Sequence, residues 1–295
     1  MAKGKNWSKR AQDFWEQRQK MAAPGGLTGY LLDEAPESVG RHRFQGEWAD
    51  LRHFLASEAV RRDRCLDVGC GTGEWLAALA GEFKRVEGWD TAPSMIKASR
   101  RSLAKKGLRN ATLKLGPVTR RPGEAVFDLI FVGGVLMYTP DSELGGLLKS
   151  LARLLKPGGL LVLRESSVEG KTWQRQGLPL RAGILAGGGQ EESDYVAIYR
   201  SPQALQGALA KAGLRLDSVG PNFNYKISDI TQDWLRRIDA WMGGGLGRNP
   251  AAAARWAGAL YHGRFFLHYP EIFVRHALGF MPWKLENSWF LASKA

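Results

Sequence analysis

The 295-residue chain contains only two cysteines, Cys65 and Cys70. They stand five positions apart in what reads as one strand-and-turn unit, so we expect no disulfide between them. The sequence has no cysteine and histidine spacing typical of a metal site, and we expect no metal. So few cysteines are typical of a reducing compartment, and we expect a cytoplasmic protein.

Long apolar runs are also absent, and none reaches the length needed to cross a bilayer. The most apolar stretch, Leu144–Leu163, is interrupted by Lys149, Arg153, Lys156 and Pro157. The N-terminal MAKGKNWSKR is basic but lacks an apolar core, which excludes a secretion signal there. A transmembrane segment is therefore not expected, whereas a peripheral contact with the inner membrane surface stays open.

The chain has fewer acidic than basic residues. The chain has 42 Lys and Arg against 29 Asp and Glu, which gives a formal net charge of +13. Residues 84–121 alone hold eleven basic side chains against Glu87 and Asp90, a local charge of +9. Such a field favours an anionic partner such as nucleic acid, anionic lipid or a phosphorylated substrate. A solvated helix face is the simpler alternative.

The pattern of apolar residues alternates between strand and helix from residue 65 onward. We expect helices at 7–20, 46–61, 74–83, 92–106, 142–155 and 203–212, and strands at 65–68, 85–89, 111–115, 127–132, 160–164, 215–219 and 289–292. This order predicts a doubly wound, mostly parallel seven-stranded α/β sheet, with an N-terminal helical segment and a helical C-terminal insertion before the last strand.

The same pattern predicts four parts of the chain. Residues 1–60 form an N-terminal helical cap and residues 61–221 a Rossmann-like ligand-binding domain. Residues 222–286 form a helical, aromatic-rich substrate cap, and residues 287–295 the last strand of the sheet.

The stretch LDVGCGTGEWL, residues 66–76, reads as a strand, a glycine turn and the start of a helix. It does not fit the dinucleotide fingerprint G-x-G-x-x-G, because Glu74 stands where the third glycine belongs. It is not a phosphate-binding P-loop either, because no Gly-Lys-Ser/Thr follows. The acidic Asp67 before the glycines would repel a phosphate and suits a ligand that carries a positive charge.

In this context the sequence resembles the class I S-adenosylmethionine-dependent methyltransferases. LDVGCGTG is similar to the first motif of that family, and VEGWD, with Asp90 at a strand end, to the second. FDLIFVGGVLMYTPD resembles the fourth-strand motif, and LLKPGGLLVLRES the helix, turn and strand that follow it. The four blocks come in the family's order and cover roughly residues 60–220.

The resemblance implies that S-adenosylmethionine is the cofactor and S-adenosylhomocysteine its product. It implies that Asp67 orients the turn and the methionine end, that Asp90 accepts hydrogen bonds from both ribose hydroxyls, and that backbone carbonyls at Gly133 meet the methionine amino group. The other residues so implied are Gly69, Cys70, Gly71, Gly73, Thr91, Met95 and Val118. Gly116-Pro117 stands where many relatives have an acidic residue for adenine, so apolar and backbone contacts, Val118 among them, must replace it.

The catalytic group is not evident from the sequence. Tyr138 follows the fourth strand and Glu165 ends the fifth, at the sheet edge where α/β folds bind ligands. His262 and His268 lie in the aromatic tail and qualify as a base if that segment closes over the site. Each has an ordinary alternative: a packed aromatic for Tyr138, a structural salt bridge for Glu165, and packed or surface residues for the histidines.

The sequence narrows the class of methyl acceptor mainly by the motifs that it lacks. The exocyclic-amine methyltransferases that act on nucleic acids and glutamine resemble one another in an Asp/Asn-Pro-Pro-Tyr motif after the fourth strand, where this sequence has GGVLMY. No Pro-Cys pair is present, so we do not expect a mechanism that passes through a cysteine adduct of a pyrimidine. Aromatic residues interleaved with arginines in the tail fit a small-molecule acceptor that is a natural product or is lipid- or sugar-linked, including an anionic one, and we expect it to bind under the C-terminal cap.

Two alternatives stay open, the first being a methyltransferase for RNA or protein that uses the basic 84–121 surface. Nucleic acid is the less favoured partner. The second is a non-catalytic cofactor-binding protein. The sequence leaves the oligomeric state and the methylated atom open.

Overall fold

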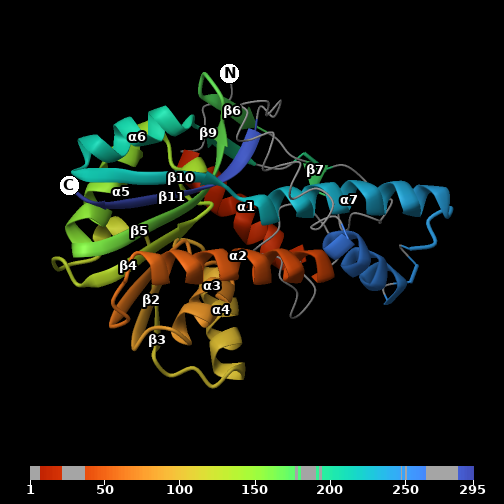
Figure 1. Ribbon diagram of the computed structural model, residues 1–295, viewed down its shortest axis with the longest axis horizontal. Coiled ribbons are helices and arrows are strands. Elements are labelled where there is room, and N and C mark those ends of the chain that lie inside the picture. The colour runs from red at the N-terminus through yellow and green to blue at the C-terminus, as the bar shows by residue number, and fades with distance from the viewer. Residues whose placement is uncertain are drawn as a thin grey trace.

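The computed structural model describes residues 7–21, 37–176, 179–180, 191–192, 195–246, 248–249, 251–263 and 285–295. A seven-stranded sheet with the order β10-β11-β5-β4-β1-β2-β3 forms its centre (Figure 1). Its strands are β1 (Arg64–Val68), β2 (Arg85–Asp90), β3 (Ala111–Leu115), β4 (Phe127–Gly133), β5 (Leu155–Val168), β10 (Leu214–Pro221) and β11 (Leu285–Lys294). All neighbours pair in parallel except β11, which is antiparallel to both β5 and β10.

Helices cover both faces of this sheet. They are α1 (Trp7–Met21), α2 (Glu37–Ser57), α3 (Glu74–Ala80), α4 (Pro93–Lys105), α5 (Asp141–Leu154), α6 (Pro202–Lys211) and α7 (Phe223–Trp241), with 3₁₀ turns η1 (Val118–Arg120) and η2 (Leu136–Tyr138). Residues 251–263 are also helical. One core cluster joins α5 and α6 to the sheet, and a second joins α2, α3 and α4 to the opposite face. The predicted doubly wound, mostly parallel fold is confirmed.

The central strand β4 shows why the chain adopts this arrangement. Phe127 to Val132 are buried without interruption, as expected for a parallel strand that is covered on both faces. Ile130 packs in the cluster of α5, whereas Phe131 packs in the cluster of α3 and lies 4.5 Å, centroid to centroid, from the Trp75 ring. The strand therefore has no solvent-exposed face, and its one charged residue, Asp128, is buried and paired with Lys156.

Helix α2 is longer than predicted, because it begins at Glu37 rather than at Gly46. Gly46 lies inside the helix, and a Cβ atom there would collide with the side chain of Asn224 in α7. The glycine reflects a close helix–helix approach and not a helix start.

Helix α4 begins at Pro93, one residue after the predicted start, and its N-cap residue Ala92 provides no side-chain cap. Glu16 of α1 accepts a hydrogen bond from the Ser94 amide at 2.9 Å. A residue far away in the sequence thus caps this helix.

Strand β5 extends beyond the predicted 160–164 at both ends. Two short antiparallel pairs that the sequence did not predict lie between β5 and α6: β6 (Trp173–Gln176) with β9 (Val196–Tyr199), and β7 (Pro179–Leu180) with β8 (Glu191–Glu192). Strand β9 contacts η2, so this hairpin abuts the loop that follows β4.

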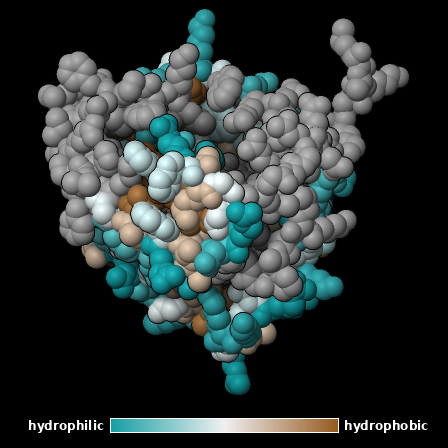
Figure 2. Space-filling view, turned by 90° about the vertical axis from the view of Figure 1, so that its right-hand side faces the viewer, coloured by the Kyte–Doolittle hydropathy of each residue, from teal (hydrophilic) through white to brown (hydrophobic). Residues whose placement is uncertain are grey.

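The C-terminal insertion is helical in its described part, as predicted. Helix α7 and the stretch 251–263 pack with the start of α2 through Val39, Leu235, Leu246, Ala253 and Ala257; we call these three helical segments the helical cap. It projects from the sheet to the right in Figure 1, and Figure 2 views the molecule from that side. Among the described residues, none of the helices combines the length and hydropathy that a membrane span requires.

Candidate active site

The glycine turn after β1 is fixed by two backbone hydrogen bonds. The amides of Gly69 and Cys70 donate to the Trp89 carbonyl of β2, at 2.7 and 3.1 Å. Gly69 has φ +70°, and a Cβ atom there would collide with Val135. Gly71 has φ +52° and no heavy atom within 4 Å of the place of a Cβ atom, so its missing side chain leaves open space for a ligand.

Asp90 joins this turn to the start of α4. Its Oδ2 accepts a hydrogen bond from the Gly71 amide at 2.9 Å, and its Oδ1 accepts one from the Ala92 amide at 2.8 Å. Burial raises the pKa of Asp90, although both amides favour the ionised form. A carboxylate offers about four lone-pair positions, so acceptor capacity is left for a hydroxyl group of a ligand.

Asp67 lies beneath the same turn with only 2% of its surface exposed. Its Oδ2 is buried and has no hydrogen-bond partner among the described residues. Burial and the nearby carboxylates of Asp90 and Glu74 raise its pKa well above the usual range. An uncompensated buried carboxylate favours a positively charged ligand, which would restore the ionised form.

Two side chains of opposite charge, Glu165 and Arg200, hold the loop after β4. Glu165 accepts hydrogen bonds from the Val135 and Leu136 amides at 2.7 and 2.9 Å, and from the Met137 amide at 3.4 Å. Arg200 donates to the carbonyls of Leu136 and Thr139, both at 2.7 Å, and pairs with Asp141. Both side chains are buried, and burial raises the pKa of Glu165 to about 7.

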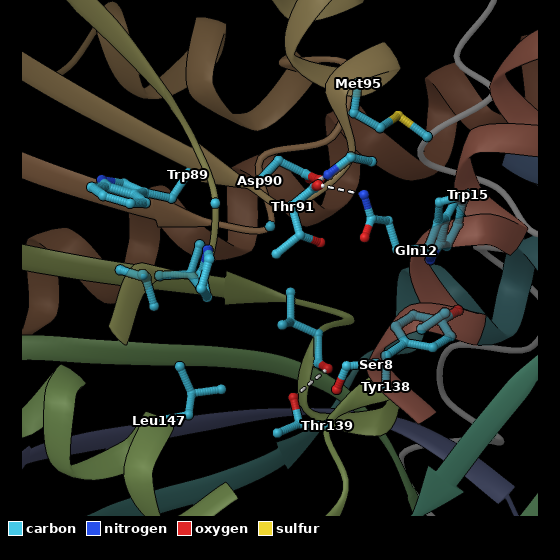
Figure 3. A pocket seen from close by; sticks show the side chains of 18 of the residues that line it. Ser8, Gln12, Trp15, Trp89, Asp90, Thr91, Met95, Tyr138, Thr139 and Leu147 are labelled. Carbon is cyan, nitrogen blue, oxygen red and sulfur yellow. Dashed lines mark hydrogen bonds between the residues drawn. The ribbon is translucent and has the colours of Figure 1, made fainter. Parts of the chain in front are cut away.

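Helix α1 forms one wall of the site (Figure 3). Gln12 donates to the Thr91 carbonyl at 3.0 Å, and Ser8 donates to Glu143 at 2.8 Å. Trp15 lies edge-on to Tyr138, with ring centroids 5.7 Å apart. Helix α1 therefore spans from the second strand's end to the loop after β4.

These elements enclose a cavity of about 530 Å³ at the carboxyl ends of β1, β2 and β4. The predicted residues in its wall are Gly69, Gly71, Asp90, Thr91, Met95, Val118, Gly133 and Tyr138. Gly116 and Pro117 line it too, next to Val118, where the sequence lacks an acidic residue. A cavity of this size and position is typical of a nucleotide-sized ligand in an α/β fold.

A family profile described as "Methyltransferase domain" matches residues 40–219, more than half of the chain. The chain belongs to this family. It is a class I S-adenosylmethionine-dependent methyltransferase. Its cofactor is S-adenosylmethionine, and the buried, unpartnered Asp67 carboxylate and the space left at Gly71 fit a ligand that carries positive charge.

Curated relatives of this methyltransferase include two bacterial demethylmenaquinone methyltransferases. That of Geobacillus kaustophilus (strain HTA426) is 36% identical over 127 residues, which is 39% of this chain and 53% of the relative, so the chain spans about half of that relative's length. That of Bacillus cereus (strain AH187) is 30% identical over 173 residues, 54% of this chain and 72% of the relative.

Solved structures share the fold of the methyltransferase at low sequence identity. Geranyl diphosphate C-methyltransferase from Streptomyces coelicolor A3(2) aligns over 100% of both chains with a TM-score of 0.57 and 14% identity. The [4+2]-cyclase SpnF aligns over 97% of this chain and 96% of its own, with a TM-score of 0.58 and 18% identity. Because one of these two is named a cyclase, the shared fold alone does not indicate the reaction.

Several predicted residues of the methyltransferase lie behind the cavity wall rather than in it. Cys70 is buried against Gly88, and Gly73 approaches Ser99 of α4 so closely that a Cβ atom would collide with it. Asp67 lies under the turn, and Glu165 lies behind the loop that it holds. These residues contact the turn and the loop, and not the cavity itself.

The predicted catalytic candidates are not brought together. Tyr138 lines the cavity, and its buried hydroxyl makes no hydrogen bond with the described residues. His262 is exposed on the stretch 251–263, where its ring centroid lies 4.6 Å from that of His42, and it is not part of the cavity wall. His268 lies outside the described residues.

Two contributions were missed from the sequence. Ser8, Gln12 and Trp15 line the cavity, although the amphipathic pattern of residues 7–20 indicated only a helical cap. Arg200 gave no signal at all, because a single arginine before a helix is unremarkable until its partners at Leu136 and Thr139 are known.

Proposed function

We propose that this methyltransferase transfers a methyl group to a small, largely apolar acceptor with a ring, held between α1 and η2. Support comes from the aromatic wall of the cavity at this end. Trp15 and Tyr138 line it, and Phe14, Tyr195 and Tyr199 pack directly behind them. Aromatic walls favour flat, apolar ligands.

The curated relatives support the same acceptor class. Both are named for methylation of demethylmenaquinone, a ring compound with a lipid tail. We propose a quinone- or phenol-type ring with an apolar substituent as the acceptor class for this chain, the wall of Trp15 and Tyr138 being the observation that carries the proposal.

The cofactor residues have distinct proposed roles. Asp90 holds the ribose hydroxyls with the lone pairs that Gly71 and Ala92 leave free, and Asp67 offsets the positive charge of the methionine end from below the turn. Gly133 contributes backbone groups. Thr91, Met95 and Val118 surround the nucleoside as parts of the wall, while Gly69, Cys70 and Gly73 set the path of the turn.

The cofactor supplies a methyl group on a sulfonium, which is already activated toward a nucleophile. The protein's task is then mainly to position the acceptor and exclude water. Helix α1 does both, because Gln12 and Ser8 tie it to Thr91 and Glu143 across the cavity. Glu165 and Arg200 act as positioning residues, since they fix the loop that carries Tyr138.

Tyr138 is the proposed aromatic contact to the acceptor, because its ring lines the cavity whereas its hydroxyl is buried. Burial raises the pKa of its hydroxyl well above the usual range, so the phenol is neutral at pH 7. A neutral phenol that is also buried does not act as a base for the acceptor. An acceptor that is itself acidic, such as a phenol or hydroquinone, needs no stronger base.

The test is methyl transfer from labelled S-adenosylmethionine to a panel of acceptors: a short-tailed demethylmenaquinone in its reduced form, a simple phenol, a sugar phosphate and RNA. We expect turnover with the ring compounds. Trp15→Ala should raise KM for them, while Trp241→Ala, an exposed tryptophan outside the cavity wall, should leave KM unchanged. Turnover with RNA or the sugar phosphate alone would refute the proposed acceptor class.

A further inference from the structure

Large apolar side chains are exposed at the outer end of the helical cap. Trp241, the last residue of α7, is 87% exposed, and Met242 beside it is 43% exposed. Trp234 on α7 and Trp256 on the stretch 251–263 are 41% and 45% exposed. Single exposed apolar residues are ordinary, but three tryptophans on two packed helical segments are not.

The sequence of α7 separates this exposed surface from the packing surface. Thr231 and Leu235, four positions apart, are buried. Trp234, Arg237 and Trp241 recur at intervals of three and four, which places them along one exposed stripe of the helix. The cap's own core is complete without the tryptophans, because it consists of Leu235, Leu246, Ala253 and Ala257 with Val39.

Basic side chains surround the tryptophans. Arg236 and Arg237 on α7, Arg255 on the stretch 251–263 and Arg248 between these two segments are all exposed. The guanidinium of Arg237 lies 5.8 Å from the centroid of the Trp234 ring and pairs with Asp233. Tryptophan flanked by arginine is the composition that prefers the boundary between lipid headgroups and acyl chains, and the positive charge complements anionic lipid.

The position of this surface suits contact with a flat partner. Helix α7 has 19 residues, so its end lies about 28 Å from its start. The start is anchored to the sheet, where Asn222 donates to Asn287 of β11 and to Glu47 of α2. The end is followed by Gly243 and Gly244, both with positive φ, which turn the chain back.

The figures place this end away from the sheet. The end of α7 projects beyond the sheet in Figure 1, and pale and tan residues gather amid teal ones on the face seen in Figure 2.

We propose that Trp234, Trp241, Met242 and Trp256, with their flanking arginines, form a contact surface for an anionic lipid bilayer. The tryptophans insert at headgroup depth and the arginines bind lipid phosphates. The link to the acceptor rests on the proposed function, because an apolar acceptor dissolved in the bilayer is reached from such a surface. The membrane contact itself rests only on the cap.

The test is flotation of the whole protein with phosphatidylcholine vesicles, with and without phosphatidylglycerol. We expect binding to the vesicles that contain phosphatidylglycerol and a loss of at least about tenfold in partitioning for Trp241→Ala/Trp256→Ala, because each change removes a large buried apolar area in the bound state. The control Arg100→Ala/Arg101→Ala, on the exposed face of α4, should still bind.

Three other outcomes would refute the proposed membrane-contact surface. It is refuted if the wild type stays unbound, or if the α4 variant loses binding and the tryptophan variant keeps it. It is also refuted if light scattering shows a dimer that the tryptophan variant dissociates, since a second copy then covers the patch. Unchanged turnover of the tryptophan variant with a water-soluble acceptor shows that it is folded and separates this result from the acceptor proposal.

Discussion

The carboxylate of Glu165 accepts hydrogen bonds from the amides of Val135 and Leu136 at 2.7 and 2.9 Å. Arg200, from the other side, donates to the Leu136 and Thr139 carbonyls. An acidic and a basic side chain thus provide hydrogen-bond partners for the backbone amides and carbonyls of one loop. That loop carries Tyr138 into the cavity wall. The arrangement fixes a loop that otherwise would carry buried, unpaired backbone groups.

Glu165→Gln should change the pH dependence of stability. The pKa of Glu165 is raised from about 4.5 to about 7 in the folded protein. The stability that the protonated side chain contributes is therefore fully present below pH 4.5 and is lost as the pH rises through 7. Over that window the wild type should lose on the order of 3 kcal/mol relative to Glu165→Gln. Urea unfolding of both proteins at several pH values measures the difference, and parallel curves would contradict the assignment.

Gly71→Ala should abolish cofactor binding at a modest cost in stability. Gly71 and Gly107 have similar positive φ values, +52° and +66°, and neither has a heavy atom within 4 Å of its added Cβ. Both alanine variants should therefore lose about 1–2 kcal/mol of stability from backbone strain. Only Gly71 borders the cavity, so S-adenosylhomocysteine should still bind to Gly107→Ala. Equal loss of binding in both would indicate a general effect of strain.

Asp67→Asn should remove a pH dependence from cofactor binding. The pKa of Asp67 is raised by burial in the free protein, and the positive charge of the cofactor favours its ionised form. Affinity should therefore rise with pH until the free protein has lost this proton. Calorimetry in buffers of different ionisation enthalpy should detect proton release by the wild type and less release by Asp67→Asn. The same release from both proteins would place the proton on another group.

Tyr138→Ala should raise KM for the acceptor about tenfold and leave the affinity for the cofactor unchanged, because it removes an aromatic part of the cavity wall. Tyr195→Phe is the matched control. Its hydroxyl lies 2.8 Å from that of Tyr199, and Tyr195 packs behind Tyr138 without lining the cavity. That change should cost stability and leave KM for the acceptor nearly unaltered. An unchanged KM for the acceptor in Tyr138→Ala would exclude the proposed contact.

The parts of the fold that could be predicted are those that residues close together in the sequence determine. Strands β1 and β4 are short apolar runs next to a helical pattern, and the turn at Gly69 to Gly73 is encoded by positive-φ glycines. The hydrogen bond from Gln12 to the Thr91 carbonyl joins residues 79 positions apart, and that from Arg200 to the Leu136 carbonyl joins residues 64 apart. No local pattern indicates such pairings.

The same limit applies within the site. Asp90 could be identified from its place at the end of a strand, but its hydrogen bonds to Gly71 and Ala92 appear only when the turn and α4 are brought together. Glu165 could be identified as a candidate, yet its role depends on the loop amides that face it. Gly46 was misread as a helix start, because the helix that packs on it lies far along the chain.

The most direct test of the account is titration of S-adenosylhomocysteine into the wild type and Asp90→Asn. Asparagine keeps the size of the side chain but loses its charge, and hydrogen bonds to a charged group contribute about 1.5–3 kcal/mol. We predict a wild type that binds and is stabilised against heat by the ligand, and an Asp90→Asn variant that binds at least about tenfold more weakly. The control Asp63→Asn, which alters the exposed pair with Lys84, should bind as the wild type does. Equal affinities of Asp90→Asn and the wild type would contradict the account.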